Sequence, residues 1–203
     1  MKSLAFAPIK SLILCVAIIA IFALGQGVAR ADTVTFSTTG SFNGGSNTIS
    51  FGAPGNLTTI TFTGVASSVQ ANPFTFSSLG QFQTTVTGTG GTIAPGTTFT
   101  LGITQTAPTP GAGSLFATLN GTIQQDQSTG LVTFAVNTTT INGVTYSLTN
   151  NPLPLVPPST NNGVTTVQAQ ITSTVPEPTT LLLLGTGLTG LAGMARRRMK
   201  REG

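Results

Sequence analysis

Apolar and polar residues alternate one by one through most of the middle of this 203-residue chain. Successive side chains of a β-strand point to opposite faces of its sheet, so this period of two predicts strands with one buried face. Residues 59–63, 82–86, 98–104, 115–123, 132–136 and 167–171 all show the pattern. Threonine is abundant between them and suits pleated sheets. No segment of the middle region shows the period of 3.6 that a helix requires.

We therefore expect residues 32–175 to form one all-β domain, either an antiparallel β-sandwich or a jelly-roll-like fold. Asn142 and Gly143 separate two apolar residues and predict a two-residue type I′ hairpin. The proline-containing segments 108–111 and 152–158 are expected to be loops that divide the strands into groups. Val136 is expected on the same buried face as Val132 and Phe134, and the ten phenylalanines of this region are expected to fill the core.

The first 31 residues have the three parts of a secretory signal peptide. Lys2 and Lys10 give a positive start, residues 11–25 are apolar, and Ala29 and Ala31 form a small-residue cleavage site. We expect a signal helix here and cleavage by signal peptidase after Ala31, which would remove Cys15, the only cysteine. A retained membrane anchor is the alternative, although about 15 apolar residues rise only about 22 Å as a helix, less than a roughly 30 Å bilayer core.

The positive charges of the chain all lie near its two ends. No Lys or Arg occurs between Arg30 and Arg196, so the net charge of +4 describes the terminal segments. Proteins bind nucleic acid largely by neutralising phosphates with Lys and Arg. The middle region has no such surface, and we expect no nucleic-acid partner.

The C-terminal segment has three parts with distinct physical properties. Pro176, Glu177 and Pro178 favour an extended peptide, because proline disrupts both helix and sheet. An apolar run over residues 181–195 is expected to form a short transmembrane helix, and a basic cluster follows that would stay on the cytoplasmic side of the membrane. This cluster, residues 196–201, contains Arg196, Arg197, Arg198, Lys200 and Arg201.

Residues 176–201 closely resemble the PEP-CTERM sorting signal of exopolysaccharide-producing bacteria with a two-membrane envelope. The resemblance implies that exosortase, a membrane-embedded transpeptidase-like enzyme, recognises Pro176, Glu177 and Pro178. The enzyme would then remove the tail and pass the protein from the inner membrane to the outer surface. An ordinary, retained C-terminal anchor is the alternative. The body also resembles choice-of-anchor K domains, which are exported β-rich modules, through residues 142–148 and a final strand at 164–172.

The middle region offers few side chains for chemistry. The chain has no His, and the body has no Cys, so neither a Ser-His nor a Cys-His pair is available. Its acid–base inventory is limited to Asp32, Asp126 and Tyr146. Asp126 is most simply a turn residue. We therefore expect no enzyme, no bound metal and no cofactor.

Two classes of function stay open for the body. The first is a non-catalytic cell-surface or biofilm-matrix protein, which could self-associate because no Lys or Arg guards its sheet edges. The second is a carbohydrate-binding module that holds exopolysaccharide. Sugar platforms usually present Trp or Tyr, and the chain has no Trp and only Tyr146, but Asn, Gln and Thr could still bind sugars by hydrogen bonds.

Overall fold

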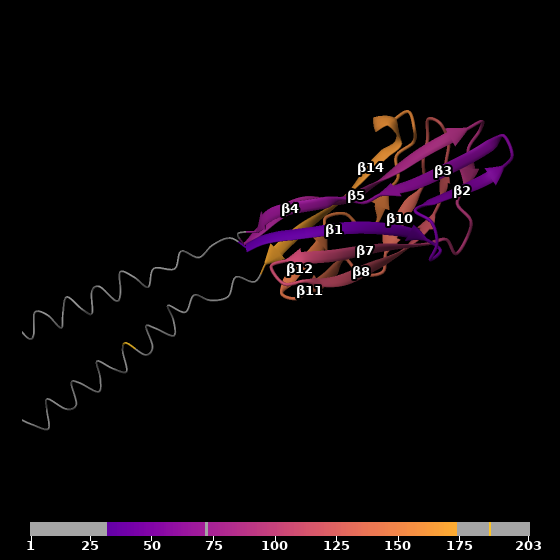
Figure 1. Cartoon of the computed structure of the whole chain (residues 1–203). Helices are drawn as coiled ribbons and strands as arrows, with labels where there is room; N and C mark the ends of the chain where they lie inside the picture. The colour runs from indigo at the N-terminus through magenta and orange to yellow at the C-terminus, as the bar shows by residue number, and fades with distance from the viewer. Residues whose placement is uncertain (1–31, 72, 174–186, 188–203) are drawn as a thin grey trace, which may run out of the picture. The chain divides into compact units, whose positions relative to one another are not determined.

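The computed structural model describes residues 32–71 and 73–173, together with Gly187 (Figure 1). The described part of the body is all-β, as the alternation predicts, and its strands belong to one compact unit. None of the described residues belongs to a helix that is long and apolar enough to cross a membrane. The expected signal helix and C-terminal transmembrane helix fall outside the described residues, so both stay predictions.

Two six-stranded sheets, both antiparallel, make up most of the body. In pairing order, the first sheet contains β13 (Leu153–Pro154), β10 (Leu131–Phe134), β8 (Gly111–Asn120), β7 (Thr98–Ala107), β1 (Asp32–Phe42) and β4 (Ala66–Ala71). The second contains β11 (Thr138–Ile141), β12 (Val144–Leu148), β14 (Val164–Ser173), β5 (Phe74–Thr87), β3 (Asn56–Thr63) and β2 (Thr48–Ala53). The short strands β6 (Gly91–Thr92) and β9 (Thr122–Ile123) pair with each other, and the 3-10 helix η1 (Asn161–Gly163) precedes β14.

The two large sheets pack face to face around one apolar core, in a sandwich-like arrangement. The rings of Phe82 from β5 and Phe99 from β7 lie 4.9 Å apart between centroids, and Phe62 from β3 lies 5.0 Å from Phe99. Such tilted pairs suit the charge distribution of aromatic rings. The alternation correctly places many of the core side chains, among them Ile60, Phe62, Phe99, Leu101, Ile103, Leu115, Leu119, Val167, Ala169 and Ile171.

The predicted hairpin at Asn142 and Gly143 is confirmed. The two residues have φ angles of 45° and 87°, the positive values that a type I′ turn requires at both central positions. They join β11 to β12, with Ile141 paired to Val144.

A β-bulge in β5 reverses which of its side chains face the core. Leu79 and Gly80 lie opposite a single residue of β14, and the pairing register shifts there. Because side chains alternate with a period of two, one extra residue moves the following positions to the other face. Phe82, after the bulge, is fully buried, whereas Phe74 and Phe76, before it, are 48% and 60% exposed.

Three phenylalanines therefore correct the expectation that all ten fill the core. Phe74 and Phe76 face outward because they precede the bulge. Phe116 is also 60% exposed, since it stands in β8 between the buried residues Leu115 and Ala117 and so points to the opposite face. The other seven phenylalanines of the described body are buried.

Two smaller expectations are also corrected. Val136 is 55% exposed, because β10 ends at Phe134 and the chain leaves the sheet before Val136. The loop at 108–111 does not divide the strands into groups: it joins β7 to its neighbour β8, with Gln105 paired to Gly111. The segment 152–158 does not divide the strands into groups either: it contains β13 of the first sheet and lies between β12 and β14, which pair with each other in the second.

Candidate functional site

The residues predicted to direct sorting lie outside the described part of the chain. These are Pro176, Glu177 and Pro178 of the motif, the basic residues Arg196, Arg197, Arg198, Lys200 and Arg201, and Ala29 and Ala31 of the signal-peptidase site. The structure does describe the part of the body to which these segments are joined.

Both ends of the body meet at the connection between β4 and β5. At the start of β1, Asp32 pairs with Ala71, the last residue of β4. At the end of β14, Thr172 pairs with Phe74, the first residue of β5, and the Ser173 N–H donates to the carbonyl of Pro73 over 3.3 Å. We call this end of the body, defined by Asp32, Ala71, Phe74 and Ser173, the junction end (Figure 1).

The sorting residues are tied closely to the junction end by chain length. Pro176 follows Ser173 by three residues. A fully extended chain spans at most about 3.5 Å per residue, so Pro176 stays within about 10 Å of Ser173. An enzyme that acts on the Pro-Glu-Pro peptide therefore works beside this end of the body.

Two exposed aromatic rings stand at the junction end. The rings of Phe74 and Phe76 lie 5.9 Å apart in an edge-to-face arrangement. Across the strand pair, their neighbours on β14 are the polar residues Thr172 and Gln170. Sequence reasoning missed this pair, although Gly80 within an alternating strand was a signal of the bulge that turns both rings outward.

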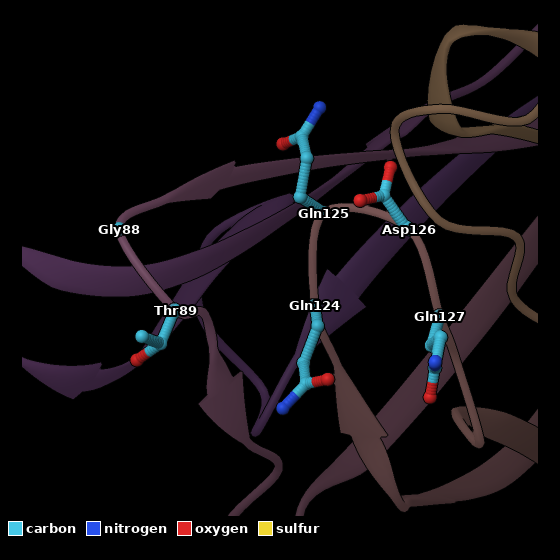
Figure 2. Close-up of a pocket in the computed structure, with 6 residues that line it drawn as sticks. All are labelled: Gly88, Thr89, Gln124, Gln125, Asp126 and Gln127. Carbon is cyan, nitrogen blue, oxygen red and sulfur yellow. The ribbon is translucent and has the colours of Figure 1, made fainter.

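A polar hollow of about 280 Å³ lies beyond the other end of β5 (Figure 2). It is lined by Gly88 and Thr89, which follow β5, and by a turn of residues 124–127. The Gln124 N–H donates to the Gln127 carbonyl over 2.8 Å, so Asp126 is a turn residue, as predicted. Figure 2 shows the Gln125 and Asp126 side chains on one side of this turn and those of Gln124 and Gln127 on the other.

Tyr146 is part of the core rather than of an accessible site. Its ring packs edge-to-face against Phe36 at 5.5 Å, and its hydroxyl donates to Gln105 Oε1 over 2.9 Å. The Gln105 amide in turn donates to the Thr109 carbonyl over 2.7 Å. Burial raises the pKa of Tyr146 to about 12, because the phenolate would be poorly solvated there. The hydroxyl is therefore protonated and shielded at neutral pH.

Asp126 and Tyr146 lie too far apart to act together. Tyr146 pairs with Ile171, which pairs with Thr75 near the start of β5, whereas Asp126 shares its hollow with Gly88, just after β5. Twelve strand residues separate these points, which corresponds to about 40 Å along β5. Within the described residues, moreover, no three His, Cys, Asp or Glu side chains gather as a metal site would require.

Comparison with protein-family models matches residues 174–198 to the PEP-CTERM protein-sorting motif. The match begins immediately after β14 and includes Pro176, Glu177 and Pro178. Comparisons with the curated proteins and with the solved structures gave no significant match. The resemblance of the body to choice-of-anchor K domains stays a prediction. The chain therefore carries a PEP-CTERM protein-sorting motif, which marks an exported protein whose sorting depends on an exosortase-like enzyme.

Proposed function

We propose that this protein is a non-catalytic component of the cell surface or the biofilm matrix, released from the inner membrane by cleavage at its Pro-Glu-Pro peptide. The observation that carries the proposal is the direct junction between the body and the sorting motif. The motif begins right after β14, so cleavage at Pro176, Glu177 or Pro178 would free an intact β-sheet body.

The outer faces of the sheets suit a neutral, hydrated matrix. Cross-strand hydroxyl pairs run over the second sheet, including Thr48 with Thr61 at 3.1 Å and Ser50 with Thr59 at 2.8 Å. At the opposite edge of the same sheet, the hydroxyl oxygens of Thr140 and Thr145 lie 2.9 Å apart. Residues 32–173 contain no Lys or Arg. Such a surface interacts with its surroundings through hydrogen bonds and is little affected by salt.

The side chains of the body support a role without catalysis. Tyr146 is buried and hydrogen-bonded, and Asp126 stands on an exposed turn about 40 Å away along β5. General acid–base catalysis needs a titratable group within hydrogen-bond reach of the substrate. Among the side chains that the structure describes, neither residue has a second titratable group beside it to share proton transfer.

The proposed route has three steps. Signal peptidase removes residues 1–31 after Ala31, while the apolar run 181–195 holds the precursor in the inner membrane. The basic cluster keeps the C-terminus on the cytoplasmic side, in accordance with the positive-inside rule. An exosortase-like enzyme then cuts at the Pro-Glu-Pro peptide and passes the body to the outer surface or the extracellular matrix.

Substitution of Glu177 tests the sorting step. Glu177→Ala should block release, so the precursor should accumulate in the inner membrane with its tail still attached. Glu202→Ala is the matched control, because it removes the other glutamate of the chain outside the motif. Cell fractionation with intact-mass measurement reads the result. Equal release of the two variants would contradict recognition of the motif.

Neutral replacement of the basic cluster tests the membrane step separately. The variant lacks the positive charges that hold the C-terminus on the cytoplasmic side, so the short apolar segment should be translocated across the bilayer. The residues replaced are Arg196, Arg197, Arg198, Lys200 and Arg201. This precursor should appear outside the inner membrane with its tail uncut. The unsubstituted protein is the reference. If it is still membrane-bound and uncleaved, the result would support a retained envelope anchor instead.

The polar hollow favours a second candidate function, a carbohydrate-binding module for exopolysaccharide. Gln124, Gln125, Asp126 and Gln127 line it, and no large apolar side chain is among its lining residues. Such groups bind sugar hydroxyls by hydrogen bonds. Retention of the protein on a column of isolated exopolysaccharide, and loss of retention with Gln125→Ala and Asp126→Ala together, would establish this function. Equal elution of both proteins would argue against it.

A further inference from the structure

The exposed rings of Phe74 and Phe76 are apolar, whereas the surface positions next to them are polar. The outward positions of β14 opposite these rings are Thr172 and Gln170, and the next outward position of β5 is Ser78. Among the described residues, only two other large apolar side chains are as exposed, Phe116 and Val136, and both belong to the first sheet or the chain just after it. A close pair of exposed aromatics often marks a contact surface.

The position of the pair indicates what it contacts. Both apolar segments of the chain, residues 11–25 and 181–195, are joined to the junction end. Gly25 lies seven positions before Asp32, and Leu181 lies eight positions after Ser173. An extended chain spans about 3.5 Å per residue, so the junction end lies within about 28 Å of the nearer end of either apolar segment. Whichever segment enters the bilayer, its short connection keeps the junction end within reach of the lipid.

We propose that Phe74 and Phe76 form a lipid-contacting patch that docks the junction end on the bilayer interface while the precursor is tethered. Phenylalanine is among the apolar residues that peripheral proteins bury at the boundary between lipid headgroups and acyl chains. The inference rests on the membrane-tethered precursor of the proposed function, but not on which enzyme releases it.

The charge of the body explains why the contact would be reversible. Residues 32–173 carry no Lys or Arg, so the body has no positive side chains with which to attract anionic lipids. Two half-exposed rings bind weakly on their own. A short tether, however, raises the effective concentration of the patch at the membrane to the millimolar range. The patch therefore docks while the tail is attached, and the body dissociates from the bilayer once the tail is cut.

Docking also places the sorting peptide. Pro176 stays within about 10 Å of Ser173, whose N–H donates to Pro73 beside Phe74. With the rings at the interface, the Pro-Glu-Pro peptide is held at the depth where a membrane-embedded enzyme can reach it. Docking of the body thus limits how far the Pro-Glu-Pro peptide can move from the bilayer.

The absence of Trp from the chain makes a direct test possible. Phe76→Trp and, as the matched control on the other sheet, Phe116→Trp each introduce a single fluorophore at a site with the same 60% exposure. Each full chain is reconstituted into vesicles of phosphatidylethanolamine and phosphatidylglycerol, with and without brominated acyl chains. We expect blue-shifted emission and several-fold quenching by brominated lipid for Phe76→Trp, and neither effect for Phe116→Trp. Adding Phe74→Ser to Phe76→Trp should lower the ratio of docked to undocked bodies about fivefold.

Several results would overturn the proposal. Equal quenching of the two variants would mean that the body lies on lipid without a preferred face, and no quenching of either would mean that it does not dock. A blue shift that appears in detergent and grows with protein concentration would identify a second copy as the partner. A shift seen only in cell membranes would identify a membrane protein. Flotation separates the two proposals: a chain that does not float with vesicles contradicts the membrane tether itself, whereas a floating chain with unquenched Phe76→Trp contradicts only the docking.

Discussion

The two ends of the body differ in chemistry, although a single strand, β5, runs from one to the other. At the junction end, Phe74 and Phe76 expose a pair of apolar rings beside the points where the chain enters and leaves the body. Beyond the other end, Asp126 and three glutamines line a polar hollow. The core between the ends is continuous, so the difference belongs to the surface alone.

The apolar side of this difference follows from one local irregularity in β5. Phe74, Phe76 and Phe82 are all even-numbered and would share a face in a regular strand. The bulge at Leu79 and Gly80 sends Phe82 into the core and the other two rings to the surface. The bulge thus places two apolar rings on the surface at one end of β5 and a core ring farther along the same strand. The predictions below alter one side of this contrast at a time.

The largest effect is expected from truncating a ring on the core side of the bulge. Phe82→Ala should lower the free energy of unfolding by about 4 kcal/mol, because it leaves a cavity among packed rings. Phe76→Ala should cost less than about 1 kcal/mol, since its ring is already largely in water. Urea unfolding of the detergent-solubilised chain gives both values. Similar losses for the two variants would mean that the faces of β5 are not assigned as described.

Removing the bulge glycine should have the next largest effect. Gly80 has a φ of 124°, and a Cβ there would overlap the Phe62 ring and lie 2.7 Å from the Thr63 carbonyl oxygen. Gly80→Ala should therefore cost about 3 kcal/mol, combining overpacking with a disfavoured backbone angle. Gly96→Ala is the control, because Gly96 also has a positive φ but its Cβ would meet no atom within 4 Å. Its cost should be about 1 kcal/mol. Equal costs would contradict the close approach at Gly80.

Alkaline titration of Tyr146 should have a slightly smaller effect. Burial raises its folded-state pKa above the usual value of 10.0 to about 12. This contribution to stability is fully present below pH 10 and is lost as the pH rises through 12. The two-unit shift corresponds to about 3 kcal/mol. Urea midpoints measured across this pH range test the loss.

Tyr146→Phe is the control for this titration. It should be less stable at neutral pH by about 1–2 kcal/mol, because Gln105 loses a hydrogen bond in the core. Its stability should then stay constant between pH 10 and 12. A variant that lost stability in parallel with the natural chain would rule out Tyr146 as the group responsible.

The smallest effect is expected at the polar end. Asp126→Asn changes one exposed turn residue and should alter the free energy of unfolding by less than about 0.5 kcal/mol. If the hollow binds exopolysaccharide, the same substitution should still weaken retention on that polymer. A large loss of stability would instead give Asp126 a structural role that its exposed position does not suggest.

The sequence predicts much of the fold because the alternation is regular where both sheets are regular. The core positions of β3, β7 and β14 and the turn at Asn142 and Gly143 follow from local rules. The exposure of Phe74 and Phe76 does not, because it depends on how β5 pairs with β14 across the bulge. Likewise, the meeting of both chain ends at the β4–β5 connection depends on pairing between residues about 40 or 100 positions apart. The sorting motif could be predicted from the sequence alone, because it is defined by a short, continuous run of residues.

The intact mass of the protein outside the inner membrane tests the central claim most directly. The account predicts a chain that begins at Asp32 and ends within or close to Pro176–Pro178, without the apolar run 181–195 or the basic cluster. This mass should be found at the cell surface or in the extracellular matrix. A chain that still ends at Gly203 and stays in the membrane fraction of the cells that make it would contradict the account.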